Sequence, residues 1–175
     1  MDTLPNGIRA VIKALKETVA PAVDTGNPLA NEQLRLACGY LALVADRMAW
    51  REQRLRSELN AAADLAATLL PYAQAGGAAV LAALREGSAC AQDLQRRPGA
   101  PESEVVRVTQ QLQAGVSALV RICASLPEPT ARAIERVVVK GAGAWLDTRR
   151  SWFAPMGFDR EAAALPPLSQ ALRER

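Results

Sequence analysis

Residues 102–126 read ESEVVRVTQQLQAGVSALVRICASL. Apolar or small side chains recur there every three or four residues, at Val105, Val108, Leu112, Gly115, Leu119, Ile122 and Leu126. This spacing places them on one stripe of a helix. Glu102 and Glu104 follow Pro101, and carboxylates favour the positive end of a helix. The segment therefore predicts an amphipathic helix that packs against others.

Similar spacing marks the rest of the chain. The expected helices cover residues 6–23, 28–71, 78–96 and 130–153, with a short one at 168–173. Turn residues separate these segments, as at Asn27-Pro28 and Gly76-Gly77, where asparagine, proline and glycine begin or end helices. The chain is thus predicted to be helical almost throughout.

The segment 28–71 could form one helix or two. A helix of that length would measure about 65 Å at ~1.5 Å per residue, which is too long for a compact domain of this size. We expect a break or kink near Ser57–Asn60, because serine and asparagine side chains compete for backbone hydrogen bonds. Whether the helix is continuous to Pro71 stays open.

Composition agrees with this pattern, since alanine supplies 35 of the 175 residues and aromatic residues only 4%. Alanine is the best helix former, whereas strands favour β-branched and aromatic residues. We expect an all-α fold, an antiparallel up-and-down bundle of four to five helices. A single domain would span residues 1–175, with an irregular C-terminal tail at about 157–175. Close helix approach is expected at the intrahelical glycines Gly39, Gly115, Gly141 and Gly143.

The residue inventory argues against many kinds of active site. Histidine is absent, and the three cysteines Cys38, Cys90 and Cys123 lie far apart. We therefore expect no metal and no cofactor, and no residue stands out as catalytic, although an enzyme acting through a lone carboxylate stays open. An odd number of widely separated cysteines is typical of reduced thiols in a cytoplasm. Residues 65–84 carry no charge, but Pro71 and Gly76-Gly77 favour a helical corner over a membrane span.

A ligand site is suggested where aromatic residues gather, between positions 145 and 158. Arg149 follows Trp145 by four residues and precedes Trp152 by three, so one helical stripe carries all three. A guanidinium between two indoles could bind an anionic group such as a phosphate or carboxylate. The alternative is structural: the aromatics close one end of the bundle, and Arg149 reaches solvent or pairs with an acid such as Glu52.

A second basic cluster consists of Arg47, Arg51 and Arg54, with Trp50 beside them. Interleaved basic and aromatic residues can follow a nucleic-acid backbone. Acidic residues dilute this face, the net charge is only +3, and no nucleic-acid motif accompanies it. We interpret the cluster as a solvated helix face and expect no nucleic-acid partner.

Short segments in the first half resemble a group of small all-helical bacterial proteins of unknown function. They are Val19–Ala22 (VAPA), Leu34–Ala37 (LRLA), Asp46–Met48 (DRM) and Leu84–Gly87 (LREG). Genes of that group often accompany genes for acyl-CoA dehydrogenases and aminoglycoside-phosphotransferase-like kinases. The resemblance implies a cytoplasmic accessory role near acyl-CoA or phosphorylated metabolites and transfers no catalytic residue. The segment from Trp145 to Phe153 departs from the pattern of the group.

Two functions follow from these observations. The first is a non-enzymatic helical-bundle protein that acts through interaction, as an accessory protein and a homodimer. Its basis is the helix expected at 102–126, where Val106, Val116 and Val120 widen the apolar surface beyond one stripe. The alternative is a small-molecule binding module that holds an anionic or acyl ligand near Trp145, Arg149 and Trp152.

Overall fold

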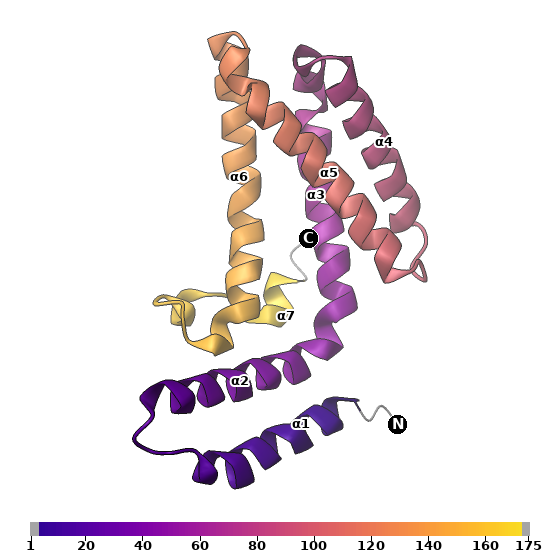
Figure 1. Cartoon of the computed structure of the whole chain (residues 1–175). Coiled ribbons are helices and arrows are strands. Elements are labelled where there is room, and N and C mark those ends of the chain that lie inside the picture. The colour runs from indigo at the N-terminus through magenta and orange to yellow at the C-terminus, as the bar shows by residue number, and fades with distance from the viewer. Residues whose placement is uncertain (1–3, 173–175) are drawn as a thin grey trace. The chain divides into compact units, whose positions relative to one another are not determined.

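The structure is a computed structural model that describes residues 4–172 (Figure 1). All regular structure in that range is helical, and the range contains no strand. The α-helices are α1 (Leu4–Ala14), α2 (Pro28–Arg47), α3 (Arg51–Ala73), α4 (Ala78–Gln95), α5 (Glu102–Ile122), α6 (Glu128–Phe153) and α7 (Leu168–Ala171). The expected all-α fold is confirmed.

The described residues divide into two compact units. The N-terminal unit comprises residues 4–51 and 150–165, and the bundle unit comprises residues 52–149 and 166–172. Helix α6 therefore contributes to both, because its residues up to Arg149 belong to the bundle unit and its last turn belongs to the N-terminal unit. The expectation of a single domain over residues 1–175 stays a prediction.

The bundle unit contains the main hydrophobic core. Helices α3 to α6 follow one another in alternating direction, as the up-and-down pattern requires (Figure 1). Its fully buried large side chains are Leu59, Leu69, Leu84, Leu94, Val108, Leu112, Leu119 and Ile134. Val108, Leu112 and Leu119 belong to the predicted stripe of residues 102–126, which indeed faces the core.

The predicted break near Ser57–Asn60 is wrong. Ser57 is buried within α3, and the helical path is interrupted earlier, by a 3-10 turn at Met48–Trp50. Arg47 precedes this turn, and its Nε donates to the carbonyl oxygen of Trp152 at 3.1 Å. This contact joins residues far apart in the chain, so local hydrogen-bonding preference could not reveal the position of the turn.

Helix α3 also passes through Pro71 and ends at Ala73. A proline ring removes one backbone donor and crowds the preceding turn, so it usually ends or bends a helix. Pro71 is exposed and lies in the last turn of α3, where few hydrogen bonds remain to be lost. The helix then ends in a 3-10 turn at Gln74–Gly76, close to the predicted corner.

The N-terminal unit is built around the antiparallel pair α1 and α2 (Figure 1). Asn27 caps α2 as predicted, because its Oδ1 accepts a hydrogen bond from the Ala30 amide at 3.0 Å, and Pro28 takes the first helical position. The helix expected at 6–23 is α1 followed by a π-helical turn, Leu15–Val19, and a 3-10 turn, Ala20–Ala22. None of the residues in α1 is buried.

The tail after α6 is largely irregular, as expected. An ion pair anchors its first part, since Arg150 Nε donates to Asp159 Oδ2 at 2.8 Å. The short helix predicted at 168–173 is α7, Leu168–Ala171, and Arg173 lies outside the described residues. Within the bundle unit, the Thr148 hydroxyl donates a hydrogen bond to the carbonyl oxygen of Ala171 at 3.4 Å.

Candidate ligand site

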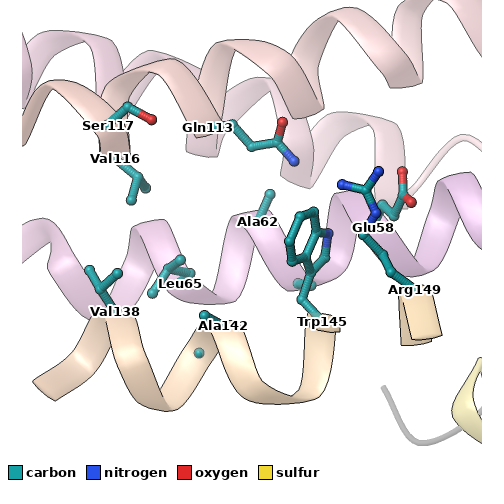
Figure 2. Close-up of a pocket in the computed structure, with 12 residues that line it drawn as sticks. Glu58, Ala62, Leu65, Gln113, Val116, Ser117, Val138, Ala142, Trp145 and Arg149 are labelled. Atoms are coloured by element: carbon teal, nitrogen blue, oxygen red, sulfur yellow. The ribbon is translucent and has the colours of Figure 1, made fainter. Parts of the chain in front are cut away.

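A pocket of about 380 Å³ opens between α3, α5 and α6, entirely within the bundle unit. This volume lies at the low end of the range for small-molecule sites. Its walls are mainly apolar (Figure 2), and the apolar lining residues are Ala61, Ala62, Leu65, Val116, Val138, Ala142 and Trp145, with Gly141 beside them. The pocket can therefore hold a molecule with a small apolar body.

Small residues create this space. Ala61 and Ala62 on α3 and Ala142 on α6 line it, and longer side chains at these positions would fill the gap between the helices. Gly141 is in closer contact: a Cβ atom at this position would lie 2.9 Å from Leu65 Cδ1. The glycine thus lets Leu65 lie against α6, and the expected close approach is confirmed at Gly141.

The charged groups of the lining, Arg149 and Glu58, lie at one end of the pocket. The guanidinium carbon of Arg149 lies 4.7 Å from the ring centroid of Trp145, a cation–π distance. The two residues are four positions apart on α6, so they occupy the same face of the helix. Figure 2 shows Arg149 and Glu58 at this end, whereas Val138 and Leu65 lie at the other.

Glu58 is already paired. Arg54 Nε donates to its Oε1 at 2.8 Å, and the two side chains are only 22% and 20% exposed. Among residues 4–172, no carboxylate forms an ion pair with Arg149, so the predicted alternative of an Arg149–Glu52 pair is not seen there. Arg54, Glu58 and Arg149 together leave one net positive charge at this end of the pocket.

Trp152 falls in a different unit from the other two predicted residues. It belongs to the N-terminal unit, where the Arg47 guanidinium carbon lies 5.8 Å from the centroid of its ring. Burial lowers the pKa of Arg47, which still keeps its charge at neutral pH. The structure therefore joins Trp145 and Arg149 at one pocket, and places Trp152 with Arg47 in a different contact.

The basic cluster of Arg47, Arg51 and Arg54 makes contacts within the protein. Arg47 donates to a backbone carbonyl oxygen and contacts Trp152, while Arg54 is held by Glu58. Its members Arg47 and Arg51 fall in the N-terminal unit and Arg54 in the bundle unit. The guanidinium groups of Arg47 and Arg54 thus have structural contacts, which differs from the solvated face that the sequence suggested.

Sequence reasoning missed the pocket residues on α3 and α5. Glu58, Leu65, Gln113 and Ser117 flank the core stripes of their helices instead of lying on them. A periodicity argument identifies the buried stripe of each helix but not which neighbouring positions meet across a gap. The available signal was the alanine-rich second stripe of α3, which leaves room beside α6.

No cluster of three or more potential metal ligands occurs among residues 4–172. In the same range no helix has the length and hydropathy of a membrane-spanning segment. Cys123 is buried in the bundle core, and burial raises the pKa of its thiol, which disfavours the reactive thiolate.

No family model, curated protein or solved structure matches this chain. The chemistry of its own residues is therefore the basis for assigning a function. The best-defined feature of that chemistry is an apolar pocket with the Trp145–Arg149 pair at one end.

Proposed function

We propose that the protein is a non-enzymatic binding module whose pocket between α3, α5 and α6 holds a small anionic or acyl ligand. The observation that supports this function best is the position of Arg149, stacked on Trp145 at the polar end of apolar walls. Such a site orients an amphipathic molecule, because the apolar part leaves water while the guanidinium receives the polar group.

Native mass spectrometry of the protein as purified from cells tests this function. We expect a retained small molecule on the wild-type protein and on Arg136→Gln, and its loss from Arg149→Gln. Arg136 is the matched control, since it is an exposed arginine on the same helix that does not line the pocket. If both variants retain the molecule equally, it is bound outside this pocket. If the wild-type protein carries no molecule and also binds no added anionic or acyl compound, the function is rejected.

A cytoplasmic location belongs to the same proposal. Cys38, Cys90 and Cys123 are free thiols in the structure, and free thiols persist in reducing compartments. The resemblance to small bacterial helical proteins adds an accessory role near acyl-CoA or phosphorylated metabolites. A ligand-binding bundle could serve that role by holding such a metabolite.

A second candidate function is interaction through a homodimer, and the apolar surface of the N-terminal unit favours it. Leu4 and Val11 on α1 are 59% and 51% exposed, and Leu29 and Tyr40 on α2 are also exposed. Val116, one of the three valines that first suggested a dimer, supports it less because it lines the pocket. We therefore propose the α1–α2 pair as the dimer surface.

A further inference from the structure

We propose that the ligand is a linear amphipathic monoanion, with its anionic group at Arg149 and its alkyl chain along α6 toward Val138 and Leu65. This inference rests on the proposed function, and it adds the charge, shape and orientation of the ligand. It is built from the charge balance at one end of the pocket, the length of the apolar wall and the contact at the other end.

The charge balance selects an anion. The Arg54–Glu58 pair cancels its own charges across 2.8 Å, which leaves Arg149 to set the net charge of this end at +1. A carboxylate that meets this guanidinium gains charge-assisted hydrogen bonds, whereas a cationic group would be repelled. A second negative charge on the ligand would find no second cation, because the pocket lining contains no basic side chain besides Arg149.

The length of the wall selects a chain. Trp145 and Val138 are seven positions apart on α6, which corresponds to about 10 Å at ~1.5 Å per residue. An extended alkyl chain of about eight carbons covers that length, given carbon–carbon bonds of about 1.5 Å. Ala142 lies between the two residues, and its small side chain leaves room for the alkyl chain to pass (Figure 2).

The outer half of the chain, past Ala142, meets Leu65, and Val138 lies beyond it (Figure 2). The Leu65 side chain lies against Gly141, and any Cβ atom at position 141 would push it from its place. Leu65 lines the pocket, and Gly141 is eight positions from Arg149 on α6, so a displaced Leu65 changes the space for the outer part of the chain and not the space at Arg149. Gly141 is thus predicted to set how long a chain the pocket accepts.

Titration calorimetry with octanoate and two uncharged probes, octan-1-ol and a neutral octanoyl thioester, tests the charge. We expect Arg149→Gln to weaken octanoate binding about three- to tenfold, the range for a partly solvated charged contact. The uncharged probes should bind Arg149→Gln and wild type equally. Arg136→Gln should match wild type with every probe, since it removes the same charge from the same helix outside the pocket.

Failure of the charge assignment differs from failure of the function. If Arg149→Gln weakens octan-1-ol or the thioester as much as octanoate, the anionic head is rejected while the pocket function stands. If the thioester binds wild type more tightly than octanoate does, the anionic head is likewise rejected. The bound ligand is then an acyl group that has no free carboxylate. If neither octanoate nor the uncharged probes bind wild type, the pocket function itself is rejected.

Chain length tests the orientation. From hexanoate to octanoate, affinity should rise about fourfold for each added methylene group that becomes buried. In Gly141→Ala this gain should shrink by at least about fourfold, because the displaced Leu65 takes the place of the last carbons. Gly143→Ala is the matched control, since a Cβ atom there meets nothing within 4 Å and the helix is the same.

An equal hexanoate-to-octanoate gain in Gly141→Ala and Gly143→Ala would reject the orientation. A continued fourfold gain per methylene from octanoate to dodecanoate in wild type would reject the proposed length of the apolar wall. Either result leaves binding of the anionic group at Arg149 intact, so each part of the inference fails separately.

Discussion

Glycine has opposite effects at two positions in the helices of this protein. A Cβ atom at Gly115 on α5 would lie 2.8 Å from Cδ2 of Leu84, whose side chain is fully buried and cannot move into solvent. A Cβ atom at Gly143 on α6 would meet nothing within 4 Å. At Gly115 the absence of a side chain therefore permits close packing of α4 and α5, whereas at Gly143 it only weakens the helix.

Alanine substitution should separate these effects. We expect Gly115→Ala to lower the free energy of unfolding by ~1–3 kcal/mol, as overpacking of a filled core does. Gly143→Ala should raise it by up to ~1 kcal/mol, because alanine is the better helix former and restricts the unfolded chain. Urea denaturation measures both. A stabilised Gly115→Ala variant would show that the α4–α5 contact can relax at little cost.

The sequence predicted single residues well where the cause is local. The stripe from Val105 to Leu119 and the Asn27 cap both follow from spacing and side-chain chemistry along a few turns. Trp145 and Arg149 were also predicted together, because their separation of four residues fixes them on one face. Trp152 shares that stripe, but Arg47, more than 100 positions earlier in the chain, contacts its ring.

At the scale of elements, long-range contacts explain what the sequence could not supply. The helices themselves were predictable, yet the turn at Met48–Trp50 contains no proline or glycine to mark it. The pocket likewise needs three helices, and no single segment shows that Glu58, Gln113 and Arg149 line one space. The helices could therefore be predicted from periodicity. The turn between α2 and α3 and the pocket could not, because they depend on residues distant in the sequence.

The tail segment offers a test of a contact between neighbouring elements. Arg150 holds the Asp159 carboxylate through hydrogen bonds at 2.8 and 3.1 Å, and the Glu161 amide donates to the same carboxylate at 2.9 Å. These bonds, first of all that from Arg150, lower the pKa of Asp159 below the ordinary aspartate value of about 3.9. The contact should thus be fully stabilising above pH 4 and should be lost as pH falls through the lowered pKa.

Nuclear magnetic resonance of the Glu161 amide can follow this titration directly, since the amide bonds to Asp159. We expect a midpoint below 3.9 in wild type, a midpoint closer to the ordinary value in Arg150→Gln, and no titration of this bond in Asp159→Asn. A wild-type midpoint at or above 3.9 would mean that Arg150 does not hold the tail in solution.

At the scale of the whole molecule, apolar burial is uneven between the two units. The bundle unit contains all the fully buried large side chains among the described residues, whereas α1 buries no residue. Helices within proteins gain most of their stability from packing an apolar face. The N-terminal unit therefore has an amphipathic helix whose apolar stripe is only partly covered by its own chain, and Val11 and Val19 remain 51% and 41% exposed.

A second copy of the chain would cover this stripe, since a two-fold axis brings the same surface of two molecules together. Analytical ultracentrifugation should show a dimer for wild type and a monomer for Val11→Asp, because a charge cannot be buried unpaired at that interface. Val139→Asp is the matched control: Val139 is 72% exposed on α6 in the bundle unit, so its variant should remain dimeric. Circular dichroism should be unchanged in both, as both valines face solvent in one chain. A wild-type monomer at high concentration contradicts the dimer, and dissociation by Val139→Asp alone would move the interface to α6.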